Sequence, residues 1–253
     1  MGRGVFLNAL TWQEAEPLLC ADPLVVLPVG AGAKEHGSHL PLGTDQTVAE
    51  YFARRLAERV AVIVLPTVTY GYYPHFSEVP GSTHLQAGTF AALVTEAIVS
   101  VRRHGPRRFL ILNTGVSTFP VLEVVARDLE RGHGLLVGVT RIEELGRRHL
   151  KGVLEQREGS HADEHETSLL LAIEPETVRR DLARAEFPER PRPPATFVPA
   201  SIRVTPGWRA SGTGVYGDPT VATAQKGAII AEAMLDDLVA AAEVLRTARW
   251  PAS

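Results

Sequence analysis

The stretch LVVLPVG (Leu24–Gly30), followed by KEHGSHLPLGTD (Lys34–Asp45), decides the fold. The first run is typical of a buried β-strand that ends in glycine. The second places His36, His39 and Asp45 just beyond its carboxyl end. Open α/β sheets build their sites at this edge. Because imidazole and carboxylate are ligands of zinc, manganese and iron, the sequence predicts a metal site here.

Other strand-like runs alternate with helical patterns along the chain. The strand runs are short, rich in β-branched residues or leucine, and closed by glycine or a turn: Ala61–Tyr70, Arg108–Gly115 and Leu135–Thr140. Helical patterns cover Gln46–Arg59, Ala87–His104, Pro120–Arg131 with Gly132 as its stop, a segment that starts near Ser160, and about Thr220–Ala248. A hairpin is expected around Thr196–Pro206. This alternation predicts a mostly parallel sheet with helices on both faces.

The composition predicts one large α/β domain over residues 1–253, because 45% apolar residues can fill one core. The formal charge of −3 comes from 29 acidic and 26 basic residues without a basic stripe, which argues against a nucleic-acid partner. No run approaches the roughly 18 apolar residues of a membrane helix, and no signal peptide is evident, so a cytoplasmic location is expected. The single cysteine, Cys20, is expected to be buried and structural.

A second cluster of polar residues is GSHADEHETS, Gly159–Ser168. It contains H-x-x-E-H, the signature of inverted zinc peptidases, for which Glu232 is the candidate third ligand. A charged helix N-terminus is the simpler interpretation, since Asp163 and Glu164 complement the helix dipole. That interpretation explains the acids but not the paired histidines.

Several ordered motifs together resemble the creatininase (creatinine amidohydrolase) family. The family pattern E-x-H-G-x-H-L-P-x-x-T-D appears as KEHGSHLPLGTD, N-G-H-G-G-N as NTGVST (113–118), and H-A-x-x-x-E-T-S as HADEHETS (161–168). The segments 70–85 and 214–227 also resemble family motifs. The resemblance implies a three-layer α/β/α sandwich, commonly assembled as hexamers, with a two-metal site that hydrolyses amide bonds.

The resemblance also implies a ligand set. His36 matches an imidazole ligand, Asp45 the carboxylate that bridges both metals, and Glu166 the third ligand. His161 matches a histidine that lines the substrate pocket.

Two positions depart from the family pattern and predict one metal ion per chain rather than two. Lys34 stands where the family has a glutamate, and Gly115 stands where it has a histidine. Both family residues are ligands of the other metal. Glu35 is the alternative carboxylate ligand, although adjacent residues in extended chain point to opposite sides.

The resemblance and the chemistry of the residues predict a metal-dependent hydrolase of a small cyclic amide or related C–N bond. Zinc is the expected ion, with manganese or iron as alternatives, and it lowers the pKa of bound water from about 15.7 to about 7. His161, Glu164 and Lys34 are the candidate bases, with His161 favoured because its ordinary pKa lies near the working pH.

A loop of aromatic residues and histidines is expected to shape the pocket. Together with His39, its members line the site for a small-molecule substrate: Tyr72, Tyr73, His75 and Phe76. Two other functions remain open. One is ring-opening hydrolysis of a C–C bond in a cyclic ketone or diketone, and the other is a metal-poor binding or regulatory role without hydrolase activity.

Overall fold

The computed structural model describes residues 4–187 and 212–248. Its strands form a five-stranded sheet in the order β1-β3-β2-β4-β5, and every neighbouring pair is parallel. Their bounds are β1 Val5–Phe6, β2 Leu24–Val29, β3 Ile63–Val64, β4 Arg108–Asn113 and β5 Leu136–Val139. The predicted parallel α/β architecture is therefore confirmed.

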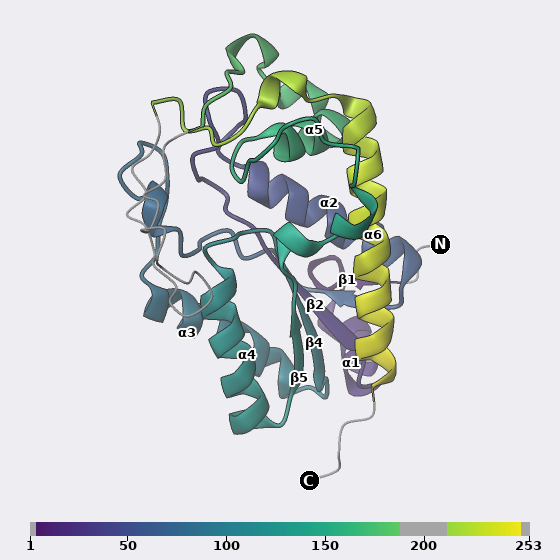
Figure 1. Ribbon diagram of the computed structural model, residues 1–253. Helices are drawn as coiled ribbons and strands as arrows, with labels where there is room; N and C mark the ends of the chain where they lie inside the picture. Colours follow the sequence, from purple (N-terminus) through teal and green to yellow (C-terminus); the bar gives the residue numbers. More distant parts are fainter. Residues whose placement is uncertain (1–3, 188–211, 249–253) are drawn as a thin grey trace, which may run out of the picture.

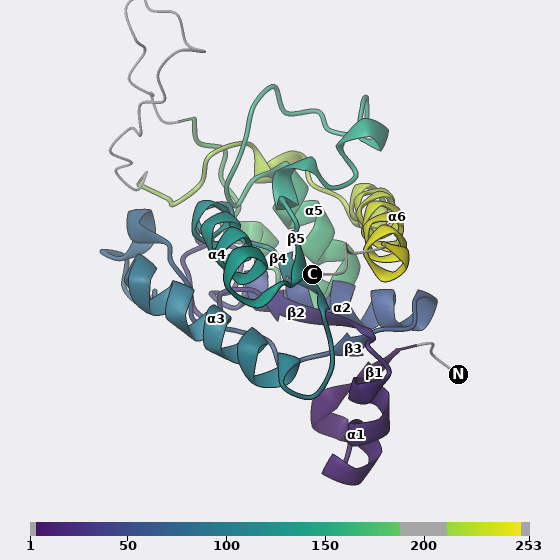
Figure 2. The ribbon, with the colours of Figure 1, turned by 90° about the horizontal axis from the view of Figure 1, so that it is seen from below.

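The α-helices cover the two faces of this sheet, as Figures 1 and 2 show. One layer consists of α1 (Trp12–Cys20), α3 (Ala87–Arg102) and α4 (Phe119–His133). The other consists of α2 (Thr44–Arg59), α5 (Glu164–Ile173) and α6 (Ala224–Thr247). The predicted three-layer sandwich is confirmed. Short 3₁₀ helices lie in the connections, at Leu7–Ala9, Pro74–Phe76, Ile142–Glu144, Arg147–His149, Pro175–Thr177, Arg180–Leu182 and Pro219–Val221.

Side chains along the central strands point alternately to the two faces of the sheet, and this divides the core into two halves. Val26 and Leu110 pack with α2 and α6, whereas Val25 and Phe109 pack with α3 and α4. Successive strand residues point to opposite faces, so a strand covered on both sides must be apolar throughout. All six residues of β2 are buried. The loops after the central strands are therefore held on a rigid base.

Several predicted boundaries are wrong. The strand expected over Ala61–Tyr70 contains only β3, because Pro66 has no N–H for the ladder; pairing resumes only as an isolated bridge from Val68 to Val29. The helix expected near Ser160 begins at Glu164, where the Asp163 side chain caps it by accepting from the Glu166 N–H at 3.1 Å.

Two other differences lie at helix ends. The C-cap of α4 is Gly134, in the left-handed region at φ +62°, rather than Gly132. Cys20, expected to be buried, is exposed because it ends α1 on the side away from Leu19, which packs in the core. The helix α1, which contains Pro17, is not among the predicted helices.

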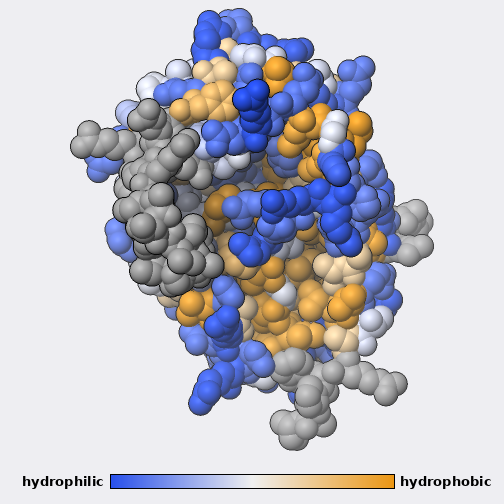
Figure 3. Space-filling view, in the orientation of Figure 1, coloured by the Kyte–Doolittle hydropathy of each residue, from blue (hydrophilic) through white to orange (hydrophobic). Residues whose placement is uncertain are grey.

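The part of the chain that the structure describes contains no helix with both the length and the hydropathy to cross a membrane. The hairpin expected around Thr196–Pro206 lies outside the described residues. In the orientation of Figure 3, hydrophobic residues gather over the lower half of the molecule, where β5 forms the edge of the sheet between α4 and α6. The β5 side chains are half-buried.

Candidate active site

The loop after β2 and the first turn of α2 bring the predicted residues together at the carboxyl end of the sheet. Asp45 is the second residue of α2. Gly30 allows this approach, because a Cβ atom at that position would clash with the backbone carbonyl of Asp45. Thr114, just after β4, fixes the same turn by donating its hydroxyl to the Asp45 carbonyl at 2.9 Å. Two neighbouring strands thus determine where the carboxylate lies.

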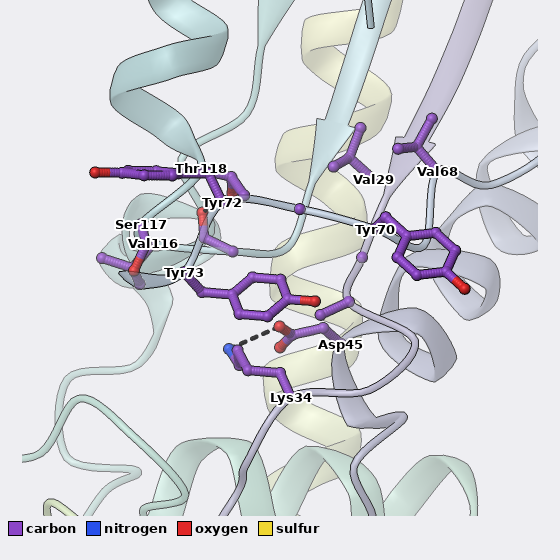
Figure 4. Close-up of a pocket in the computed structure, with 14 residues that line it drawn as sticks. Val29, Lys34, Asp45, Val68, Tyr70, Tyr72, Tyr73, Val116, Ser117 and Thr118 are labelled. Carbon is purple, nitrogen blue, oxygen red and sulfur yellow. Dashed lines mark hydrogen bonds and ion pairs between the residues drawn. The ribbon is translucent and has the colours of Figure 1, made fainter. Parts of the chain in front are cut away.

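Asp45 is buried between two basic side chains. Its Oδ2 lies 2.7 Å from the Lys34 ammonium, the ion pair drawn in Figure 4, and its Oδ1 lies 2.9 Å from His36 Nε2. Burial alone would raise the pKa of Asp45, but Lys34 and His36 outweigh it and hold the pKa well below its usual range. Burial also acts to lower the pKa of Lys34, and the carboxylates of Asp45 and Glu166 reverse that effect and raise it. The site therefore holds a permanent ion pair.

His36 is fully buried and has an acceptor at each ring nitrogen. Nδ1 lies 2.8 Å from the Lys34 carbonyl, and Nε2 faces the Asp45 carboxylate. A neutral imidazole has only one N–H to donate, so both contacts are satisfied only if both nitrogens carry protons or if a cation replaces one proton. With Nδ1 donating to the carbonyl, the Nε2 lone pair is oriented for a metal that Asp45 would share. The residues present therefore fit a divalent ion.

His161 enters the site from the segment before α5. Ala162 adopts a left-handed conformation at φ +48°, and His161 pairs with the backbone of Tyr216 in an isolated antiparallel bridge. Left-handed backbone is unusual for alanine and is held only by its surroundings. His161 Nε2 lies 3.0 Å from Glu35 Oε2, and the other Glu35 oxygen accepts from the Gly37 N–H. Glu35 thus orients the imidazole of His161.

Glu166 completes a cluster with the two histidines. One ligand atom each from His36, His161 and Glu166 lies within 4.8 Å of the others. Glu166 Oε2 also accepts from the Ala162 N–H at 2.6 Å. Burial raises the pKa of Glu166, against the opposing effect of His161 and Lys34. Such a carboxylate beside two imidazoles is stabilised by a cation.

Two predicted acids do not join this cluster. Glu164 is fully buried, but its carboxylate accepts from Lys226 and from the backbone N–H groups of Glu155 and Gln156. It therefore ties α5 to α6. Glu232 pairs with two arginines of α2 on the surface, so it cannot supply the ligand that the inverted-peptidase interpretation needs.

The aromatic residues lie beside the candidate site, but they are more buried than residues at the rim of a pocket usually are. The Phe76 ring lies 4.5 Å from the His161 ring, and the Lys34 ammonium lies 5.4 Å from the Phe76 ring centre. Tyr73 is buried and donates its hydroxyl to the Thr83 carbonyl. Tyr72 and His75 are half-buried. These side chains cover the Lys34 side of the site.

His39 lies in the same region and is fully buried. Its Nε2 lies 2.8 Å from the Thr167 hydroxyl, and its Nδ1 has no hydrogen-bond partner among the described residues. Burial lowers the pKa of His39 to about 4, so the ring is neutral at neutral pH.

Gly115 and Lys34 stand at the two positions where the family pattern has ligands of the other metal. A Cβ atom at Gly115 would lie 2.6 Å from Thr118 Oγ1, so a side chain there requires Thr118 to move. Between Gly115, Lys34 and the tyrosines lies a cavity of about 20 Å³, which Figure 4 shows in close-up. This volume suits about one water molecule. The Lys34 side chain lines this cavity, and its ammonium lies 2.7 Å from Asp45 Oδ2.

Sequence reasoning missed the residues that enclose a larger space on the other side of Asp45. They belong to the connection from β5 to α5 and include Leu145, Leu150 and Leu154. The part of the connection that contains these leucines, residues 140–158, carries no motif, so only the three-dimensional arrangement identifies them.

Comparison of the sequence with known proteins finds a family match and several named relatives. The creatininase family model, described as creatinine amidohydrolase, matches residues 8–242. A creatinine amidohydrolase of Pseudomonas putida is 31% identical over 92% of this chain and 94% of its own. A mycofactocin precursor peptide peptidase of Mycobacterium tuberculosis is 30% identical over 90% of this chain and 86% of its own. A 3-dehydro-scyllo-inosose hydrolase of Thermotoga maritima is 24% identical over 93% of this chain and 81% of its own.

Solved structures show the same fold. A manganese creatininase superposes with a TM-score of 0.76 at 27% identity, covering 97% of this chain and all of the other. A creatininase variant of Zn-Zn type has a TM-score of 0.76 at 26% identity, covering 97% and 99%. The fold, the ordered motifs and the match over nearly the whole chain lead to one conclusion. The chain belongs to the creatininase family of hydrolases.

Proposed function

We propose that this protein is a metal-dependent hydrolase of a C–N bond in a small cyclic amide or a related amide. The observation that carries the proposal is the buried cluster of Asp45, His36, His161 and Glu166 at the carboxyl end of the sheet. Burying so many polar groups is costly unless a ligand or a charge partner stabilises them. The relatives named for hydrolysis of creatinine and of a peptide support an amide substrate.

We propose His36, Asp45 and Glu166 as the ligands of one divalent ion. Zinc is the favoured ion, with manganese or iron as alternatives, because the donors are imidazole and carboxylate. When bound, such an ion polarises a carbonyl and lowers the pKa of a water molecule. Glu35, the alternative ligand, is instead engaged by His161 and Gly37.

The side chains around the proposed ligands are suited to accept a proton and to compensate the charges that result. With Nε2 donating to Glu35, the Nδ1 lone pair of His161 faces Glu166 at 3.9 Å and can accept a proton. Glu35 would stabilise the resulting imidazolium. Lys34 supplies a fixed positive charge beside Asp45, where it neutralises the carboxylate that the proposed ion shares.

The proposal predicts about one tightly bound divalent ion per chain. Elemental analysis of the purified protein, divided by the protein concentration, measures this ratio. Two ions per chain with Glu35 in the coordination shell would contradict the single-ion site. Absence of any bound metal, even after incubation with zinc, would favour the metal-poor binding role.

A second candidate function is ring-opening hydrolysis of a C–C bond in a cyclic ketone or diketone. It is supported by the relative named as a hydrolase of 3-dehydro-scyllo-inosose, a ring that carries carbonyl groups. Assaying the metal-loaded protein against cyclic amides and cyclic diketones in parallel distinguishes the two reactions.

We propose that the chain forms one domain over residues 1–253 and acts in the cytoplasm as a homo-oligomer, with a hexamer as the expected form. Supporting an oligomer, Tyr70 is 54% exposed next to the buried Tyr73, and the half-buried strand β5 leaves one edge of the sheet without a neighbour among the described residues. Light scattering at micromolar concentration measures the assembled mass. A monomeric mass would refute this prediction.

A further inference from the structure

A cavity of about 480 Å³ lies between α2, α5 and the connection from β5 to α5. Its volume falls in the range of sites that hold drug-sized ligands. Asp45 and Glu166, two of the proposed ligands, line it. A group bound in the cavity therefore lies next to the proposed metal. The small cavity on the Lys34 side has room for about one water molecule, whereas the larger one has room for a substrate.

Apolar surface makes up most of the wall of this cavity. Val48 of α2 and Leu169 of α5 are buried at its inner end. The connection from β5 to α5 adds residues that are only partly buried and pack against the same core cluster: Ile142, Leu145, Leu150 and Leu154. Their remaining apolar surface gains free energy when a ligand removes it from water. The wall therefore favours an apolar group.

Charged side chains of both signs line the cavity: the acids Asp45, Glu143, Asp163 and Glu166 and the bases Arg147 and Lys151. Glu143, Arg147 and Lys151 line the outer part and are of both signs, and Arg147 already pairs with Glu144. His165, next to Glu166, is half-buried and has no hydrogen-bond or ion-pair partner among the described residues. An imidazole offers one donor and one acceptor, which suits the N–H or C=O of an amide.

We propose that the substrate is an amide with a bulky apolar substituent, branched aliphatic or aromatic, beside the scissile C–N bond, and that this substituent occupies the cavity. The inference rests on the proposed function, since it takes the metal site as the reaction centre. A single small ring would leave most of the volume to water. The leucines of the connection, above all Leu150 and Leu154, then determine which substrates bind.

Two hydroxamates with the same metal-binding head and different tails test this inference. Acetohydroxamate and 4-phenylbutanohydroxamate are titrated into the zinc-loaded protein by calorimetry. The phenyl tail should bind in the cavity and make the second compound at least about tenfold tighter. Leu150→Asp places a carboxylate in the wall, so it should abolish this preference and leave acetohydroxamate affinity unchanged. Leu18→Asp, the same change at an exposed leucine of α1, should keep the preference.

Equal affinity of the two hydroxamates in the wild-type protein would overturn the inference without affecting the metal site. If Leu150→Asp does not fold, Leu150→Ala replaces it. This variant should bind the phenyl compound severalfold more weakly and acetohydroxamate with unchanged affinity. If the protein binds no zinc, the proposed function fails instead, and the cavity is tested alone with 4-phenylbutanamide on the metal-free protein. Binding that Leu150→Asp or Leu150→Ala weakens supports the cavity, and absence of binding overturns it.

Discussion

His36→Ala is expected to remove both the bound metal and the hydrolytic activity. His36 is fully buried, and its Nε2 faces Asp45, with which we propose that it shares the ion. Loss of a ligand leaves the remaining carboxylates without the cation that stabilises them, so metal affinity falls steeply. Metal content by elemental analysis and turnover of a cyclic amide, both measured on purified variants, test this outcome.

His161→Ala is the matched comparison, because its ring centre lies 5.1 Å from that of His36 and it occupies the same cluster. We expect this variant to keep its metal and to lose about a hundredfold or more in turnover, the scale of a positioned proton-transfer group. Loss of metal from His161→Ala would show that it is a ligand. Full activity would assign the proton transfer to another group, such as Lys34.

Lys34→Met is expected to destabilise the metal-free protein by at most about 3–5 kcal/mol, because it removes the ammonium that pairs with the buried Asp45 carboxylate and leaves only His36 beside it. Denaturation by urea measures the free energy of unfolding. The depressed pKa of Asp45 means that the ion pair contributes stability above the ordinary pKa, about 3.9, and loses it at lower pH. The difference in unfolding free energy between the wild type and Lys34→Met should therefore become smaller as the pH falls below about 4.

Lys151→Met is the control for this change, since it removes an exposed lysine that forms no ion pair within the described part of the chain and should shift stability by no more than about 0.5 kcal/mol. Added zinc should restore part of the stability of Lys34→Met, because a bound cation also neutralises Asp45. Equal unfolding free energies for wild type and Lys34→Met would mean that the ammonium does not stabilise the carboxylate.

The sequence predicts the fold well because its central strands, β2 and β4, are buried on both faces. An uninterrupted apolar run such as Leu24–Val29 is compatible with few other positions in a soluble α/β protein. The strand expected around β3 is too long. The hydrophobic pattern continues past Pro66, but proline has no N–H and cannot continue the hydrogen bonds of the sheet. The helix α1 was missed although Thr11 and Glu14 form a capping box, since Pro17 interrupts its pattern.

The sequence indicates which residues belong to the candidate site, but it does not indicate which of their side chains contact one another. His36, Asp45 and Glu166 were identified by their motifs, and their roles remain proposals. The pairing of Glu35 with His161 joins residues 126 positions apart, which no local pattern indicates. Similarly, Glu164 looks like a candidate base until its contact with Lys226 is seen. Long-range contacts decide the role of each acid.

The connection from β5 to α5 has a consequence for how such enzymes diverge. It forms the outer wall of the large cavity, yet it contains only short 3₁₀ helices and contributes no strand or α-helix to the sandwich. Loops of this kind tolerate substitution and insertion better than the elements they join. Mutations in residues 140–158 of this connection, which precede His161, can therefore change the shape of the cavity while the cluster around Asp45 stays intact. Substrate choice and reaction chemistry can evolve separately in this fold.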